Sequence, residues 1–106
     1  MVRQLTPAEA ADALASPMPP RLLDVRTQTE HRLARIRGAH YIPMDQLPKR
    51  IEELDPHEPI IVMCHHGLRS MQVALWLRAR GFTAVDNLAG GIERWSREVD
   101  PSVPRY

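Results

Sequence analysis

Residues 60–77 have the sequence IIVMCHHGLRSMQVALWL, which is an apolar run, a polar loop that begins with a cysteine, and a helix-forming run. A short buried strand that passes through a tight loop into a helix directs backbone N–H groups and the positive end of the helix dipole at the loop. Such donors stabilise an anion, and a thiolate is an anion. The segment therefore predicts a strand, a loop and a helix that together present Cys64 as a nucleophile.

The rest of the chain alternates strand-like and helix-like runs. Strands are predicted at residues 2–5, 21–26, 39–42, 59–63 and 84–86. Helices are predicted at 6–15, in a short segment after Thr27, at 44–54, from the loop after Cys64 to about residue 80, and at 91–99. This alternation is typical of an α/β fold, with a parallel β-sheet flanked by helices on both faces. Such sheets bind ligands outside the carboxyl ends of their strands, where Asp24 and Cys64 both lie.

Composition and charge exclude several classes of protein. With 106 residues the chain is long enough for one domain, and we expect residues 1–106 to form it. The formal charge of +1 argues against nucleic-acid binding. Residues 1–14 lack the apolar core of a secretory signal, and the sequence has no run of about eighteen apolar residues. We therefore expect a cytoplasmic protein without a membrane span.

Cys64 is the only cysteine in the sequence. It excludes an internal disulfide and a four-cysteine zinc site, and the chain has no second thiol to resolve an oxidised Cys64. Whatever Cys64 acquires must therefore leave to another molecule. His65 and His66 follow directly, but adjacent side chains in a tight loop diverge and no carboxylate lies close in sequence. We expect no metal and no other cofactor, and we expect the two histidines to shape the mouth of the site.

Three segments together resemble the rhodanese-like sulfurtransferases, and the resemblance covers nearly the whole chain. They are LLDVR at 22–26 with Glu30, IRGA at 36–39 and Ile42-Pro43; VMC at 62–64 with the loop to Ser70; and GF at 81–82 with NLAGGI at 87–92 and Trp95. One stretch departs from the family, because Ala34-Arg35-Ile36 stands where the family usually has Gly-His-Ile. It lies away from the loop in the order of motifs, so it bears on local packing rather than on chemistry.

The resemblance implies the rhodanese fold and sulfur transfer through Cys64. The Cys64 thiolate would take a sulfane sulfur from thiosulfate or a similar donor, hold it as a persulfide, and pass it to cyanide, a thiol or a protein. The loop that binds the persulfide and the substrate would consist of His65, His66, Gly67, Leu68, Arg69 and Ser70.

Individual residues of this site have separate expected roles. Gly67 permits a turn that a side chain would hinder, and Arg69 offers a planar fork for the oxygens of an oxyanion. Asp24 and Arg26 are expected to be structural, by hydrogen-bonding loop backbone beside the site. Gly90-Gly91 predicts a turn into the last helix.

Residues 95–106 also look like the rhodanese domains that are fused behind adenylylating enzymes and charge sulfur-carrier proteins. This second likeness implies a sulfur-carrier or other protein as the acceptor.

Two alternatives remain open from the sequence. A cysteine phosphatase or arsenate reductase also uses a cysteine, an amide-lined loop and an arginine. Phosphatases of this type place five residues between the cysteine and the arginine, whereas four residues separate Cys64 from Arg69. A non-catalytic interaction module on the same fold is the other alternative. Its usual mark is loss of the cysteine, and Cys64 is present.

Overall fold

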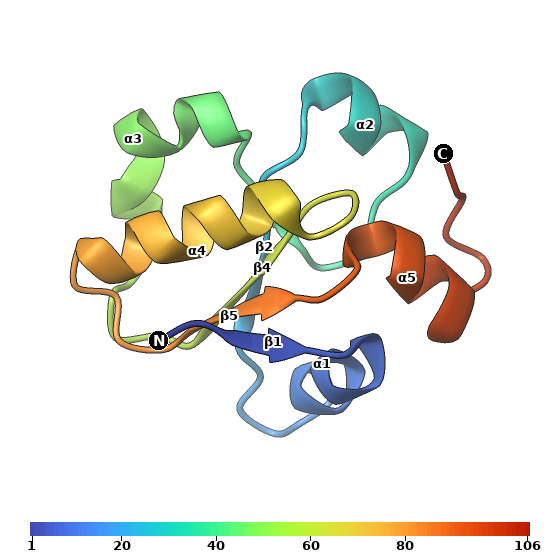
Figure 1. The fold of residues 1–106 in the computed structure, drawn as a ribbon, viewed down its shortest axis with the longest axis horizontal. Helices are drawn as coiled ribbons and strands as arrows, with labels where there is room; N and C mark the ends of the chain where they lie inside the picture. Colours follow the sequence, from blue (N-terminus) through green and yellow to red (C-terminus); the bar gives the residue numbers. More distant parts are fainter.

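Five parallel strands form the centre of the molecule in a computed structural model that describes all residues 1–106 (Figure 1). Their order in the sheet is β1-β5-β4-β2-β3, and every neighbouring pair is parallel. The strands are β1 (Arg3–Leu5), β2 (Arg21–Asp24), β3 (His40–Tyr41), β4 (Ile60–Met63) and β5 (Val85–Leu88). The carboxyl ends of β2 and β4 lie side by side, because Asp24 pairs with Met63 in the register.

Helices cover both faces of this sheet. They are α1 (Pro7–Leu14), α2 (Gln28–Leu33), α3 (Leu47–Arg50), α4 (Leu68–Ala79) and α5 (Gly91–Glu98), with 3-10 turns η1 (Met44–Gln46) and η2 (Ile51–Glu53) on either side of α3. The predicted α/β fold, with a parallel sheet between two layers of helices, is therefore confirmed. No helix combines the length and the apolar character that crossing a bilayer requires.

Strand β4 shows why the sequence folds this way. Ile60 and Val62 point into one core with α3 and α4, whereas Ile61 and Met63 point into a second core with α1 and α5. All four side chains are at most 1% exposed. A central parallel strand is buried on both faces, and it is therefore a continuous apolar run rather than an alternating one.

Residues 44–54 differ from the prediction, because they form three short pieces rather than one helix. Pro48 has no N–H to donate to the carbonyl of Met44 four residues earlier, so an α-helix that begins at residue 44 lacks a bond at its start. The turns close over three residues instead, with Gln46 N–H donating to the Pro43 carbonyl and Leu54 N–H to the Ile51 carbonyl.

Capping boxes fix the starts of α1 and α2. Thr6 and Glu9 exchange hydrogen bonds at α1, and Thr27 and Glu30 do the same at α2. The second box matters for the site, because it holds the Glu30 side chain close to the backbone at the start of its helix. The C-terminal segment then runs back from α5 towards α2 (Figure 1).

Candidate active site

The Cys64 sulfur lies between the end of β4 and the start of α4, in a cradle of loop donors. Its Sγ accepts hydrogen bonds from the backbone N–H groups of Gly67, at 3.1 Å, and Ser70, at 3.3 Å. The Sγ–H donates to Ser70 Oγ over 3.3 Å. A hydroxyl both donates and accepts, so Ser70 can turn its proton towards a thiolate. With Cys64 only 1% exposed, these donors rather than water would solvate the charged sulfur.

The loop is held from behind by the N-terminus of α5. Ile92 N–H donates to the Cys64 carbonyl over 2.9 Å, and Glu93 N–H donates to the His65 carbonyl over 3.2 Å. This approach leaves no room for a side chain at Gly91, where a Cβ would overlap the His65 carbonyl group. The loop carbonyls therefore face α5, which leaves the loop N–H groups to face the sulfur.

Strand β5 supports the other side of the loop. The Asn87 Nδ2 group donates to the Gly67 carbonyl over 3.1 Å. Gly67 has φ +103°, and a Cβ on it would lie 3.3 Å from the Gly90 nitrogen. The predicted need for glycine at position 67 is therefore seen in both its backbone angle and its surroundings.

The loop histidines differ in their surroundings. The His65 ring stacks on the Tyr106 ring with centroids 3.9 Å apart, and burial, followed by the charge of His66, lowers its pKa. His66 is exposed, and Leu68 is 79% exposed beside it. No group of three His, Cys, Asp or Glu side chains is arranged to hold a metal ion. The two histidine rings thus border the loop in contact with each other, with centroids 3.8 Å apart.

Arg69 does not present an open fork to solvent. Its two terminal nitrogens donate to the two carboxylate oxygens of Glu30 at 2.6 and 2.8 Å. These bonds hold the pKa of Glu30 well below its usual range and raise the pKa of Arg69. The suggested role of Arg69 in holding donor oxygens stays a prediction, because in this structure the fork already holds a carboxylate.

Tyr106 joins this ion pair to a buried arginine. Its hydroxyl donates to Glu30 Oε2 over 2.9 Å and accepts from Arg26 Nη1 over 2.9 Å. Burial raises the pKa of Tyr106 to about 12, so the hydroxyl keeps its proton at neutral pH. The C-terminal segment thereby contacts the loop through the His65 stack and the ion pair through its hydroxyl.

Asp24 and Arg26 form a fully buried ion pair at the end of β2. Arg26 Nε and Nη2 donate to the Asp24 carboxylate at 2.9 and 2.8 Å, and the same guanidinium donates to the carbonyls of Glu30 and Ala34. The carbonyls that it binds belong to α2 and its C-terminal cap, not to the loop that follows Cys64. The two residues therefore fix the helix that carries Glu30, and so reach the loop through Arg69.

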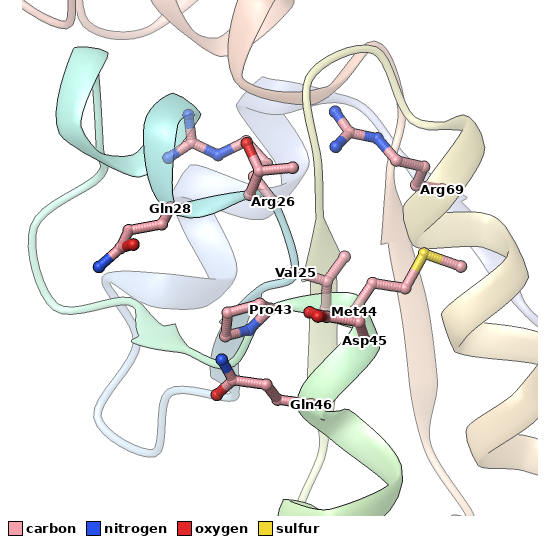
Figure 2. Close-up of a pocket in the computed structure, with 9 residues that line it drawn as sticks. Val25, Arg26, Gln28, Pro43, Met44, Asp45, Gln46 and Arg69 are labelled. Carbon is pink, nitrogen blue, oxygen red and sulfur yellow. The ribbon is translucent and has the colours of Figure 1, made fainter.

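A cleft of about 490 Å³ opens beside Arg69, between the start of α2 and η1. Figure 2 shows Gln28 and Gln46 on its walls with Pro43 between them, and Met44 and Arg69 on the opposite side. Neutral polar groups and short apolar surfaces thus line most of this space. Arg69 is the residue that belongs to both the loop and the cleft.

The sequence located the loop but missed two parts of its surroundings. Residues 64–67 form a loop and residues 68–70 the first turn of α4, and of these only Gly67 and Ser70 donate N–H groups to Sγ. Glu30 had been noted only within a family signature, and Tyr106 only within a C-terminal likeness. The sequence indicates that Thr27 can cap a short helix that carries Glu30, but it gives no sign that Glu30 also binds Arg69.

Comparisons with known proteins show the family of this chain. The family model described as "Rhodanese-like domain" matches residues 6–98. The chain is 32% identical over 103 residues to a protein of Allochromatium vinosum named "Sulfurtransferase", with 97% of this chain and 96% of that one aligned. The crystal structure of a rhodanese-like domain protein from Staphylococcus aureus superposes with a TM-score of 0.86 at 28% identity, over 99% of both chains.

Other relatives are much longer than this chain. The Arabidopsis thaliana protein named "Rhodanese-like/PpiC domain-containing protein 12, chloroplastic" is 42% identical over 89 residues, which are 80% of this chain and 30% of that protein. The Zea mays protein named "Adenylyltransferase and sulfurtransferase MOCS3-1" is 33% identical over 92 residues, which are 80% of this chain and 20% of that one. The chain therefore spans less than a third of either relative.

Substitution of Gly91 by alanine tests the contact between α5 and the loop. Gly91→Ala should lower the free energy of unfolding by about 2 kcal/mol or more, since it adds backbone strain at positive φ to overlap with the His65 carbonyl. Gly81→Ala is the matched control, because Gly81 also has positive φ but open space where its Cβ would lie. Urea denaturation gives the free energy of unfolding of both variants. Equal losses of stability would contradict the close approach of Gly91 to the His65 carbonyl.

Removal of Arg26 tests the buried ion pair. Arg26→Leu should cost about 3–5 kcal/mol of stability, because it leaves the Asp24 carboxylate buried without a partner. Arg3→Leu, which removes the exposed partner of Asp86, should cost far less. Thermal and urea unfolding of the two variants provide the comparison, and similar losses would show that burial of the Asp24 pair carries no special cost.

Proposed function

The chain belongs to the rhodanese-like family, and from that premise we propose that it is a sulfurtransferase that carries sulfane sulfur on Cys64. The observation that carries this proposal is the Cys64 Sγ in a loop whose Gly67 and Ser70 N–H groups point at it. A lone buried cysteine in a core would be surrounded by apolar groups. Here the donors instead favour the charged form that attacks a sulfur donor.

The reaction takes place in two displacements. The Cys64 thiolate attacks the outer sulfur of a donor such as thiosulfate, the S–S bond of the donor breaks, and sulfite leaves with the bonding electron pair. Cys64 then holds a persulfide with an anionic terminal sulfur. A nucleophile such as cyanide or a thiolate attacks that sulfur, and the electron pair returns to Cys64 Sγ as thiocyanate or a new persulfide departs.

The loop supplies donors for the anionic terminal sulfur. Leu68 and Arg69 are the first residues of α4, so their N–H groups have no partner inside the helix. They lie between Gly67 and Ser70, whose N–H groups already bind Sγ. We assign the persulfide-binding role to residues 65–70 as one loop, with Asp24 and Arg26 fixing the adjacent helix α2.

The alternative activities fit this loop less well. A phosphatase must surround a tetrahedral phosphate above its cysteine, whereas this shorter loop turns its N–H groups onto the sulfur itself. A silent interaction module has no need for a buried cysteine with three polar partners. Sulfur transfer uses each of these features.

We also propose a protein acceptor for the sulfur. The chain has no second thiol, so the persulfide must be discharged by another molecule. His66 and Leu68 are exposed at the mouth of the loop, where a partner has access. The likeness to a relative named as both an adenylyltransferase and a sulfurtransferase supports an acceptor from a sulfur-carrier system.

Thiosulfate should add the mass of one sulfur atom to the intact protein. Cyanide should then remove that mass and release thiocyanate, because the terminal sulfur is the electrophile of the second step. Cys64→Ser should abolish both events while circular dichroism and the unfolding midpoint stay close to those of the wild type. Intact-protein mass spectrometry and a thiocyanate assay provide the measurements.

Two results would contradict this assignment. One is continued turnover of thiosulfate by Cys64→Ser, since another group would then carry the sulfur. The other is hydrolysis of an aryl phosphate at a rate comparable to sulfur transfer, since the loop would then have room for phosphate.

Enzyme that already carries the Cys64 persulfide can be used to compare protein acceptors with small thiols. Second-order rate constants for loss of the persulfide sulfur should be higher with sulfur-carrier proteins of the source organism than with glutathione or dithiothreitol. Leu68→Ser should slow the protein acceptors and leave the small thiols unchanged, because it alters only exposed surface at the mouth. If glutathione reacts faster than every protein tested, the acceptor is a small molecule.

A further inference from the structure

The edge of Arg69 formed by its two terminal nitrogens is occupied, so a sulfur donor finds only the Nε side of the guanidinium without a carboxylate. Both of its terminal nitrogens are bound by the Glu30 carboxylate, at 2.6 and 2.8 Å. A donor that brings a sulfonate group must either displace Glu30 or bind beside it. Either course places two negative groups close together, which is unfavourable.

Glu30 is also held in position by hydrogen bonds from residues other than Arg69. Its carboxylate accepts from the backbone N–H and the hydroxyl of Thr27, at 3.1 Å each, and from the Tyr106 hydroxyl at 2.9 Å. Tyr106 is itself fixed by its stack on His65 and by Arg26. Swinging Glu30 away would break the cap of α2 as well as the ion pair, so the carboxylate remains when a donor arrives.

The charges around the cleft add to this effect. The charge of Arg26 is balanced by Asp24, and that of Arg69 by Glu30. Asp45 also lines the cleft, and it makes no ion pair. Together these five groups carry one net negative charge, so neither arginine is an unbalanced positive charge beside the cleft.

We propose that Glu30, held by Tyr106, makes this site discriminate against dianionic donors, and that its preferred sulfur donor is the persulfide of an organic thiol. The proposal rests on the sulfur-transfer function proposed above. The organic part of the donor occupies the cleft of about 490 Å³ in Figure 2, between Gln28 and Gln46 and beside Arg69. Thiosulfate has no organic part and gains nothing from that space.

The transfer step is balanced without any further reactant. The Cys64 thiolate attacks the outer sulfur of R–S–SH, and the S–S bond of the donor breaks. The electron pair leaves with R–S⁻, which takes the proton from the transferred sulfur, so R–SH departs and Cys64 holds the anionic persulfide. The same attack on thiosulfate releases sulfite, which carries two negative charges, next to Glu30.

Binding to protein that cannot turn over tests the discrimination directly. In the Cys64→Ser background, Glu30→Gln should lower the dissociation constant of thiosulfate about tenfold, because the side chain keeps its shape and loses its charge. Glu53→Gln is the matched control, since Glu53 also binds an arginine through both oxygens but has no contact with the loop. Titration calorimetry with thiosulfate gives all three constants.

Steady-state kinetics separate specificity from general damage. With Cys64 present, Glu30→Gln should raise kcat/KM for thiosulfate about tenfold, mainly through KM, and change the value for the persulfide of N-acetylcysteine amide, which has no carboxylate, less than twofold. Tyr106→Phe keeps the ring on His65 but removes one of the contacts that fix Glu30, so it should shift the same ratio in the same direction by about threefold. If Glu30→Gln does not fold, the Tyr106→Phe variant alone provides the test.

The outcomes distinguish this inference from the function on which it rests. An unchanged thiosulfate dissociation constant in Glu30→Gln, or binding in neither protein, overturns the inference even if sulfur transfer proceeds. Equal gains for thiosulfate and the organic persulfide overturn it as well. Tighter thiosulfate binding with no sulfur transfer from any donor supports the inference and overturns the proposed function.

Discussion

The shape of the Cys64 loop depends on its contact with the N-terminus of α5. Two N–H groups of that helix bind the carbonyls of Cys64 and His65, at a separation that only glycine at position 91 permits. With its carbonyls turned towards α5, the loop directs N–H groups at the sulfur. The chemistry proposed for Cys64 thus depends on a helix that begins 27 residues later in the chain.

A second set of contacts connects the loop to α2 and the C-terminal segment. The buried pair of Asp24 and Arg26 fixes α2, which places Glu30 against Arg69. The Tyr106 hydroxyl then bonds to both Glu30 and Arg26. Donors on the loop favour a negative sulfur, while Glu30 limits the negative charge that a donor brings. A site can therefore stabilise an anionic sulfur without being a general anion-binding site.

Local signals in the sequence were enough for the fold and for the place of Cys64. The apolar run at 60–63 and the alternation of elements predicted the α/β sheet and the loop at the end of its central strand. The Glu30 contacts join residues 39 and 76 positions apart, and no periodicity reports such pairs. Gly90-Gly91 was visible, but as a turn alone, because the element packed against it lies far away in sequence. The single domain and the cytoplasmic location stay predictions.

The most direct test of the central claim is a crystal structure of the protein after exposure to a sulfur donor. The account predicts one additional atom bonded to Cys64 Sγ, within hydrogen-bonding distance of backbone N–H groups of residues 65–70, and Glu30 still bound to Arg69. An unmodified Cys64 in protein that transfers sulfur in the same solution would contradict the account, because the sulfur would then be carried elsewhere.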